Sequence, residues 1–194
     1  MRAFVAVVPP AEVLAPLAER WPTLRAAYPG LSWPAPDRWH VTLAFLGELR
    51  SGQLHRLRAR LAPLTASAAP FQLVVAEPGA FPPAGRPRVL WVGLGGELAA
   101  LTDLAGGVRR AARQARIELD RKPFRPHITV ARVRRELPAH DLPHILRKLS
   151  AGAGRGWEAD RLVLMESTLG PRPAYTEVAA WPLAGRISNE LAAE

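Results

Sequence analysis

The sequence predicts an α+β fold in which antiparallel sheets are covered on one face by helices. Stretches with helical and with strand-like periodicity alternate along the 194 residues. Several neighbouring strands are joined by connections that favour hairpins over parallel crossovers. One short polar motif also occurs twice, which indicates two structurally related halves.

The first half contains helices and strands with recognisable boundaries. The spacing predicts a strand at 2–8, a helix at 11–28, a strand at 38–46, a helix from Ser51 to about Leu64, and strands at 71–75 and 89–94. Gly30 follows the first helix, and Ser51 is expected to cap the second. A loop rich in proline and glycine is predicted for residues 77–87.

The second half continues the same alternation. The pattern predicts a helix at 97–116, a strand at 127–133, a helix at 139–150, a pair of strands at 159–167 and 174–181, and a short helix after Gly185. The adjacent glycines at 106–107 weaken the first of these helices. The last two strands, with a turn at 169–173 between them, are expected to close a sheet.

Composition limits the class of protein and the chemistry it can carry. The chain is long enough for one domain with a proper core, and 48% of its residues are hydrophobic. It has no cysteine, which excludes disulfides, thiolate metal ligands and a cysteine nucleophile. No apolar run reaches the length of a membrane span, and the opening apolar stretch meets Pro9 too soon for a signal peptide. We therefore expect a cytoplasmic protein.

Positive charge is concentrated in one segment. The formal net charge is +9, and residues 109–135 hold ten Arg or Lys against two acidic residues. This segment surrounds the second copy of the duplicated motif, so it suits a polyanionic partner such as RNA. The alternative is a solvated face in a chain that uses arginine freely.

The duplicated motif has the form Arg-x-His-apolar-Thr-apolar-Ala. Its copies are Arg38-Trp-His40-Val-Thr42-Leu-Ala44 and Arg125-Pro-His127-Ile-Thr129-Val-Ala131. In a strand, alternation places each His and Thr on one face and the apolar residues between them on the other. A lone copy would be a weak signal, but a sheet has no need for His and Thr at matching positions in both halves. Two such strands would bring four polar groups around one cleft.

The residue types in the motif suit phosphoryl chemistry. Imidazole has an ordinary pKa near neutrality, so one histidine can accept a proton while the other donates one. Threonine hydroxyls and a nearby arginine can bind the non-bridging oxygens of a phosphate. None of these steps needs a metal or another cofactor.

With these flanks the sequence resembles the 2H phosphoesterases, which are named for two His-x-Thr/Ser motifs. The opening strand at 2–8 and the segments at 40–47 and 126–132 carry the resemblance, and within the group the chain is most similar to bacterial and archaeal RNA 2′,3′-cyclic phosphodiesterases, long called 2′-5′ RNA ligases. The resemblance implies a bilobal fold with two antiparallel sheets facing across a V-shaped groove, helices outside and pseudo-twofold symmetry. Residues 1–194 would form one domain with His40 in one lobe and His127 in the other.

The resemblance also implies an activity and the roles of individual residues. The expected reaction is hydrolysis of a 2′,3′-cyclic phosphate at an RNA end to a 2′-phosphate, with reversible 2′-5′ ligation to a 5′-hydroxyl. By position, His127 corresponds to the general base and His40 to the general acid. Phosphate ligands correspond to Thr42, Thr129 and Arg132, and Phe45 lies near where a terminal base can stack.

Strict alternation conflicts with the role of Arg132. It lies five residues after His127, so a regular strand would place the two side chains on opposite faces. The strand must therefore bulge or end near Ala131 for Arg132 to reach a phosphate. Otherwise Arg38 or Arg125, each two residues before a histidine, would be the better phosphate ligand.

Two alternative functions remain open on the sequence. One keeps the fold but takes a small cyclic nucleotide or a cyclic phosphate of ADP-ribose as substrate. The other is a non-catalytic RNA-binding module, against which the missing aromatic RNA-binding motifs count. We expect RNA ends, in tRNA-like or other fragments, as the partner of a monomer, with no membrane contact. His140 and His144 share a helix face but lack a third ligand, so no metal site is expected.

Overall fold

The computed structural model describes residues 1–83, 86–168, 170 and 174–185. The strands are β1 (Arg2–Val7), β2 (Leu31–Ser32), β3 (Val41–Glu48), β4 (Phe71–Phe81), β5 (Val89–Gly96), β6 (His127–Val133), β7 (Gly156–Ala159), β8 (Arg161–Thr168) and β9 (Ala174–Pro182). The helices are α1 (Ala11–Ala27), α2 (Ser51–Ser67), α3 (Leu98–Gln114) and α4 (Asp141–Leu149), with short 3-10 turns η1 (Pro36–Arg38) and η2 (Ser150–Gly152).

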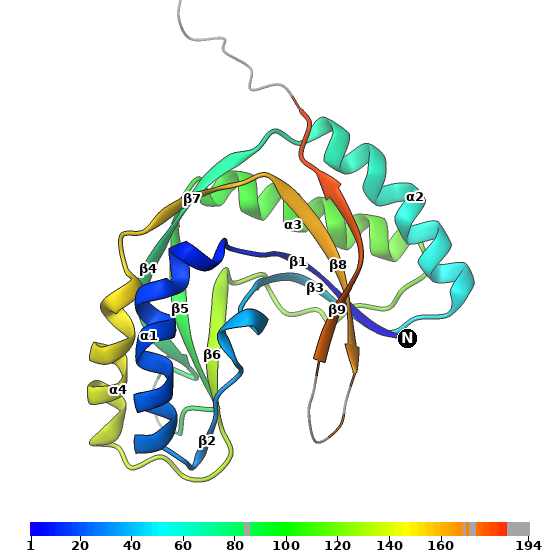
Figure 1. The fold of residues 1–194 in the computed structure, drawn as a ribbon. Coiled ribbons are helices and arrows are strands. Elements are labelled where there is room, and N and C mark those ends of the chain that lie inside the picture. The colour runs from blue at the N-terminus through cyan, green and yellow to red at the C-terminus, as the bar shows by residue number, and fades with distance from the viewer. Residues whose placement is uncertain (84–85, 169, 171–173, 186–194) are drawn as a thin grey trace, which may run out of the picture.

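The described strands form one strongly curled antiparallel sheet (Figure 1). Its order is β7-β4-β5-β6-β3-β1-β8-β9, and β2 pairs separately with β6. Each pairing in this order is antiparallel. The two central strands, β3 and β6, are joined only by the pair Val41↔Ile128. The predicted α+β class and antiparallel sheets are thus confirmed, with the two sheets meeting at one residue pair.

The strand order has a pseudo-twofold arrangement about that central pair. Val41 and Ile128 each directly follow a motif histidine, so the two copies of the motif meet at the centre of the sheet. Moving outward from β6, the strands β5, β4 and β7 match β1, β8 and β9, which follow outward from β3. We call β6, β5, β4 and β7 one lobe, and β3, β1, β8 and β9 the other lobe. In the chain, β1-α1-β3-α2-β4 is followed by β5-α3-β6-α4-β8, so each repeat contributes its last strand to the opposite lobe.

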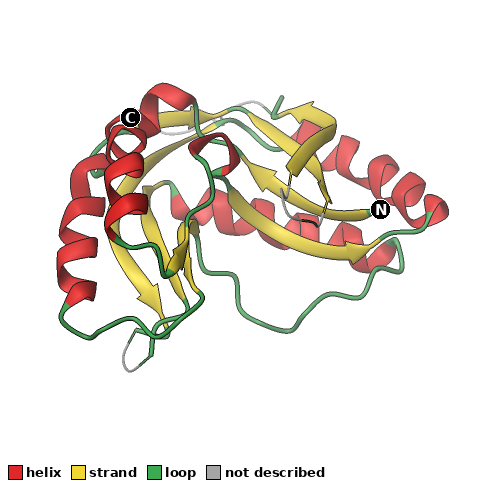
Figure 2. Cartoon of the chain, turned by 60° about the horizontal axis from the view of Figure 1, so that its bottom comes forward, coloured by secondary structure: helices red, strands yellow, loops and turns green. Residues whose placement is uncertain are grey.

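Helices cover the outside of both lobes (Figure 2). α1 and α4 pack together near β4, whereas α3 packs on β3 and carries α2, which also meets β9. Their buried residues join those of the strands in one large core. A second, smaller apolar cluster of Phe4, Ala6 and Val163 lies apart from that core. It belongs to the sheet face that also carries His40, because Phe4 stacks against that imidazole.

Several boundaries differ from those predicted. β4 continues to Phe81, so the loop predicted from residue 77 begins later. The pairing of β4 with β5 shifts in register between Val75 and Pro78, and β4 continues beyond the proline. Ser51 is the first helical residue of α2 and not its cap. The N-cap residue is Arg50, whose backbone N–H donates to the Gln53 side chain. β3 begins at Val41, since η1 occupies the predicted start of that strand.

Four short elements of the described chain were not predicted from the sequence. These are β2, β7, η1 and η2, each of two to four residues, too short to show a period. The helix predicted after Gly185 and most of the predicted turn at 169–173 lie outside the described residues. None of the helices in the described part of the chain has the length and apolar character to cross a membrane.

Candidate active site

The two motif histidines lie side by side in the sheet order. His40 directly precedes β3, and His127 is the first residue of β6. The single β3–β6 pair joins the residues that follow them. The charge of His127 also lowers the pKa of His40, which requires the two imidazoles to be close. The fold thus brings together two residues 87 positions apart in the sequence.

Each imidazole is held by the same backbone contact. Nδ1 of His40 lies 2.7 Å from the Arg38 carbonyl oxygen, and Nδ1 of His127 lies 2.7 Å from the Arg125 carbonyl oxygen. A carbonyl oxygen can only accept, so Nδ1–H donates in both cases. The neutral imidazoles then carry a lone pair on Nε2, which is the tautomer that can accept a proton from a reactant.

Both histidines have a pKa below the ordinary value of 6.5. For each, the main cause is burial, which penalises the charged form, and the hydrogen bond to the backbone carbonyl partly opposes it. The positive charge of Arg132 lowers the pKa of both residues further. In the free protein near pH 7 both imidazoles are therefore predominantly neutral.

Arg132 reaches the histidines because β6 bulges. Leu90 of β5 pairs with Ala131 but the next residue, Trp91, pairs with Thr129, so Val130 is the extra residue on β6. Val130 and Ala131 are accordingly both buried, and Arg132 is exposed. The bulge shifts the alternation by one residue, which returns Arg132 to the face of His127 and Thr129. Its electrostatic effect on both imidazoles agrees with this placement.

The first copy of the motif contains the same bulge. Val5 of β1 pairs with Ala44 and Ala6 pairs with Thr42, so Leu43 is the extra residue on β3. The residue that follows this bulge is Phe45, whose side chain is 61% exposed. Phe45 and Arg132 therefore occupy equivalent positions, five residues after their histidines, with different chemistry.

The remaining predicted phosphate ligands differ in how they are placed. Thr42 and Thr129 are half-buried, and in the described part of the chain neither hydroxyl has a protein hydrogen-bond partner. Arg38 and Arg125 contact the histidines through their backbone carbonyls. The Arg125 guanidinium lies over the Phe81 ring, 5.7 Å from its centroid, and Arg38 lines a separate cavity. With the bulge present, Arg132 is the arginine that the structure brings to the pair.

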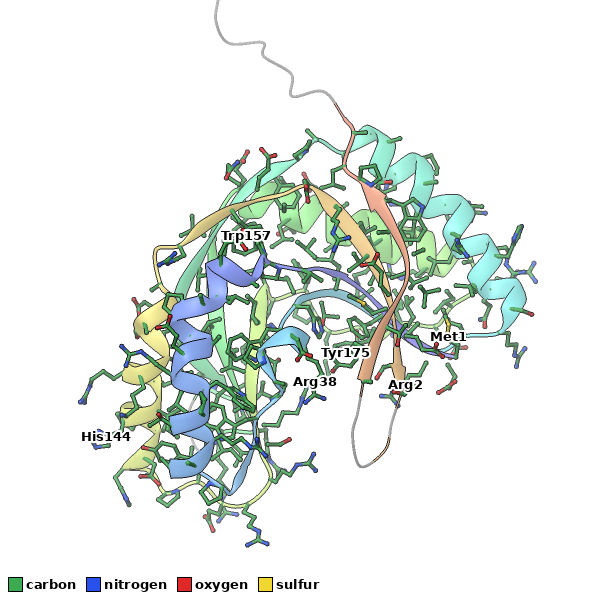
Figure 3. The ribbon with its side chains drawn as sticks, in the orientation of Figure 1. Met1, Arg2, Arg38, His144, Trp157 and Tyr175 are labelled. Atoms are coloured by element: carbon green, nitrogen blue, oxygen red, sulfur yellow. The ribbon has the colours of Figure 1, made fainter. Side chains whose placement is uncertain are left out.

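Aromatic rings flank both imidazoles, and none of these four rings was predicted from the sequence to lie there. Phe4 stacks on His40 at a centroid distance of 4.6 Å, and Tyr175 meets the same imidazole edge-on at 5.3 Å. Figure 3 shows Tyr175 on β9 beside the concave side of the sheet. In the other lobe Phe81 meets His127 edge-on at 5.1 Å, and Trp91 lies 6.4 Å from it. These rings contribute to the burial that lowers both pKa values.

Trp91 is held in place by a glycine on the neighbouring strand. It lies against Gly79 of β4, where a Cβ atom would collide with the indole. The glycine therefore allows the indole to lie against the β4 backbone, where its ring is tilted by 58° to that of His127. A Trp opposite a Gly on the neighbouring strand, together with the alternation of β5, could have indicated this placement.

Other polar residues singled out in the sequence lie away from this pair. His140 precedes α4 and lies 3.6 Å from Asp141, and Figure 3 shows His144 on the outside of the same helix. Among the described residues, no three potential metal ligands lie together. Within the basic segment, Arg109 is paired with Asp120, whereas Arg121, Lys122 and Arg125 are exposed in the connection from α3 to β6.

Comparison with known proteins agrees with this arrangement. The model of the 2′-5′ RNA ligase superfamily matches residues 10–171. The chain belongs to this superfamily. Members of the superfamily with curated names include RNA 2′,3′-cyclic phosphodiesterases of Thermus thermophilus, 35% identical over 99% of this chain and 95% of that protein, and of Archaeoglobus fulgidus, 35% identical over 77% and 82%. The protein of the same name from Geobacillus stearothermophilus is 37% identical over 82% of this chain. The matched region covers half of the Geobacillus protein.

Solved structures of the superfamily share the fold. A crystal structure of a Thermus thermophilus protein superposes with a TM-score of 0.80 at 32% identity, covering 96% of this chain and all of that one. Escherichia coli LigT complexed with 3′-AMP gives a TM-score of 0.70 at 25% identity, covering 94% and 97%. The curled antiparallel sheet is thus the fold of this superfamily.

Proposed function

We propose that this member of the 2′-5′ RNA ligase superfamily hydrolyses 2′,3′-cyclic phosphate ends of RNA to 2′-phosphates, using His40 and His127 as a metal-independent acid–base pair. The observation that carries this proposal is the pair of imidazoles at the centre of the sheet, both held through Nδ1 so that Nε2 is left for a reactant. The relatives of that name support the choice of substrate.

The chemistry follows from the groups present. His127 accepts a proton from water as the water oxygen attacks phosphorus. The bond from phosphorus to the 3′-oxygen breaks, and His40 donates a proton to that oxygen, so a 2′-phosphate and a 3′-hydroxyl result. Arg132 and the hydroxyls of Thr42 and Thr129 bind the non-bridging oxygens, where negative charge increases in the transition state. Arg38 and Arg125 orient the imidazoles through their carbonyls.

The acid role of His40 requires a proton that the free protein holds only weakly. Burial and the nearby positive charges of Arg132 and His127 lower its pKa. The bound phosphate diester is an anion, which favours protonated imidazole and offsets those positive charges. The proton at His40 is therefore taken up together with the substrate, and the two histidines titrate as a coupled pair.

The same groups can transfer the phosphoryl group to an alcohol in place of water. If a 5′-hydroxyl of RNA takes the place of water, His127 accepts its proton and a 2′-5′ linkage forms. By microscopic reversibility that linkage can be cleaved back to the cyclic phosphate. We also propose that the two repeats form a single domain, because each repeat gives its last strand to the other lobe.

The test is direct. The purified protein is given an RNA that ends in a 2′,3′-cyclic phosphate, in buffer with EDTA, and the products are separated by chromatography. The proposal predicts an RNA with a 2′-phosphate end, formed by wild type and not by His40→Ala. The proposal would be contradicted if wild type shows no turnover or if the variant is as active as wild type. It would also be contradicted if EDTA abolishes the activity and added metal restores that activity.

Salt dependence separates polymeric RNA from a small cyclic nucleotide as the substrate. A site that binds several phosphates together with the exposed cations at 121–125 should lose affinity steeply as salt rises. The proposal predicts a steep rise of KM with salt for an RNA oligomer. A salt-independent KM would favour the small substrate.

A further inference from the structure

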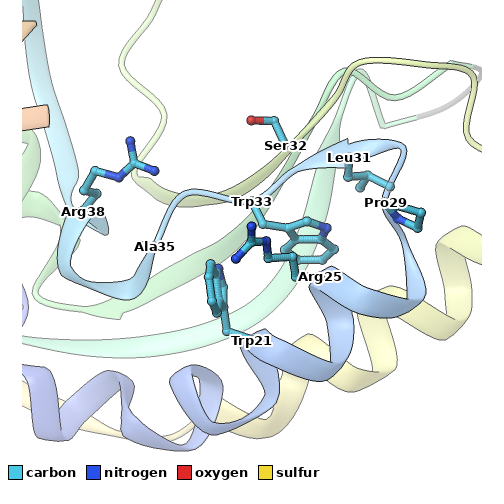
Figure 4. Close-up of a pocket in the computed structure, with 8 residues that line it drawn as sticks. All are labelled: Trp21, Arg25, Pro29, Leu31, Ser32, Trp33, Ala35 and Arg38. Carbon is cyan, nitrogen blue, oxygen red and sulfur yellow. The ribbon is translucent and has the colours of Figure 1, made fainter. Parts of the chain in front are cut away.

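A separate cavity is lined neither by the two histidines nor by their proposed phosphate ligands Thr42, Thr129 and Arg132. It has a volume of about 530 Å³ and is walled by α1, by the segment that contains β2, and by η1 (Figure 4). Its lining includes two indoles, those of Trp21 and Trp33, and two guanidinium groups, those of Arg25 and Arg38. Among the described residues, no carboxylate lines it.

The walls of the cavity are fixed by hydrogen bonds. Trp21 donates its indole N–H to the Pro34 carbonyl oxygen at 2.9 Å, and Trp33 donates to the Tyr28 carbonyl oxygen at 3.1 Å. The Arg25 guanidinium lies over the Trp21 ring, 5.2 Å from its centroid, and Figure 4 shows it beside both indoles. A cation and an aromatic ring in contact form a surface on which another flat ring can stack.

Two residues of the lining connect the cavity to the strands that follow His40 and His127. Arg38, at one end of it, is two residues before His40 and holds that imidazole through its carbonyl. Ser32, in the opposite wall, is paired with Arg132 across β2 and β6. Ser32 also accepts a hydrogen bond from Arg134 at 3.4 Å, which adds a third guanidinium at this edge. The cavity therefore lies close to His40 along the chain and close to Arg132 across the sheet.

We infer that this cavity binds the nucleotide that precedes the cyclic phosphate end, with its base against Trp21 and its phosphodiester near Arg25 and Arg38. The inference rests on the proposed function, because it needs a cyclic phosphate at the histidine pair to set the direction of the strand. A 2′,3′-cyclic phosphate terminates the 3′ end, so the rest of the RNA can leave the site only through its 5′ side. Indoles next to guanidinium groups provide the stacking and charge that single-stranded RNA requires. The enzyme is thereby selective for a strand over a single nucleotide.

Two substrates separate the cavity from the catalytic pair. One is a nucleoside 2′,3′-cyclic phosphate, and the other is a dinucleotide that ends in the same cyclic phosphate. The wild-type kcat/KM is expected to be higher for the dinucleotide. Base stacking alone predicts a preference of roughly tenfold or more.

Variants at the cavity test the assignment. Arg25→Glu and Trp21→Ala should remove most of the dinucleotide preference. Arg20→Glu is the matched control, since it makes the same charge change at an exposed position of α1 outside the cavity and should keep the preference. Trp21→Phe keeps a ring and should retain part of it, which distinguishes lost stacking from lost folding.

Several results would overturn the inference. The first is that wild type shows no preference for the dinucleotide. The second is that Arg25→Glu lowers kcat/KM equally for both substrates, which would place the terminal base itself in the cavity. The third is that Arg20→Glu lowers the preference as much as Arg25→Glu does, which would indicate an effect of bulk charge. If wild type hydrolyses neither substrate, the proposed function fails. Calorimetric titration with the dinucleotide that ends in a 2′-phosphate then still decides whether the cavity binds it, through the loss of affinity in Arg25→Glu.

Discussion

The lobe that carries His40 and the lobe that carries His127 share a frame but differ in what the frame presents. In both, a histidine donates Nδ1–H to the carbonyl of the residue two positions earlier, and a bulge follows the motif threonine. After the bulge one lobe presents Phe45 and the other Arg132. The backbone pattern thus sets the two imidazoles, and the residue after the bulge sets what surrounds them.

A symmetric frame can in this way serve an asymmetric reaction. A phosphate between two identical half-sites would have no preferred acid and no preferred base. The guanidinium of Arg132 offers charge for the phosphate, whereas the exposed ring of Phe45 offers a surface for a base. A nucleotide that satisfies both groups can bind in one orientation only.

The largest effects should come from breaking the common frame at the histidines. His40→Ala and His127→Ala are each expected to lower kcat by roughly 10²–10⁴, the range of a general acid or base. A substrate whose leaving 3′-oxygen is replaced by sulfur separates the two roles, because a thiolate leaves without a proton. It should restore much of the activity of His40→Ala and little of that of His127→Ala, as measured by single-turnover kinetics. The reverse pattern would exchange the two roles.

The next effect should come from the two residues after the bulges. Arg132→Ala is expected to lower kcat/KM by roughly 10²–10³, because it removes a charged donor to the phosphate in the transition state. Phe45→Ala should mainly raise KM, since stacking holds the base and not the reacting atoms. Steady-state kinetics on the same RNA oligomer separates these outcomes. Equal losses of kcat in both variants would mean that the two positions do not differ in role.

The threonines should show a smaller and more even effect. Thr42→Ala and Thr129→Ala each remove one hydrogen bond to an anionic phosphate, so kcat/KM should fall by about 10- to 100-fold. Thr→Ser keeps the hydroxyl and serves as the matched control. A loss in Thr42→Ser as large as that in Thr42→Ala would show that packing of the methyl group, and not the hydroxyl, is what matters.

The smallest expected effect is a shift of the pH profile. In the proposed mechanism the active form carries one proton on the pair, and burial together with Arg132 lowers both pKa values in the free protein. The maximum of kcat/KM should therefore lie below pH 6.5, and kcat should peak at higher pH because the bound phosphate anion raises both values. In Arg132→Ala one positive charge is lost, so the pKa of each histidine rises. Imidazole proton shifts followed by NMR check this; unchanged pKa values in that variant would place Arg132 away from the pair.

Much of this site could be predicted from the sequence, and the remainder depended on tertiary contacts. Alternation around His40 and His127 identified both strands, because apolar and polar residues alternate along a strand that has one buried face. The same alternation placed Arg132 on the wrong face unless β6 bulged, and a bulge adds a residue without a signal of its own. Tyr175 reaches His40 from a strand far along the chain, which no local pattern reveals.

A crystal structure with a nucleoside 2′-phosphate bound would test the two-histidine mechanism. The phosphate is expected to lie between Nε2 of His40 and Nε2 of His127, within hydrogen-bond distance of Arg132. Both Nδ1–H groups should still donate to the carbonyls of Arg38 and Arg125. A phosphate bound away from either imidazole, or an imidazole that turns its Nδ1 toward the phosphate, would contradict it.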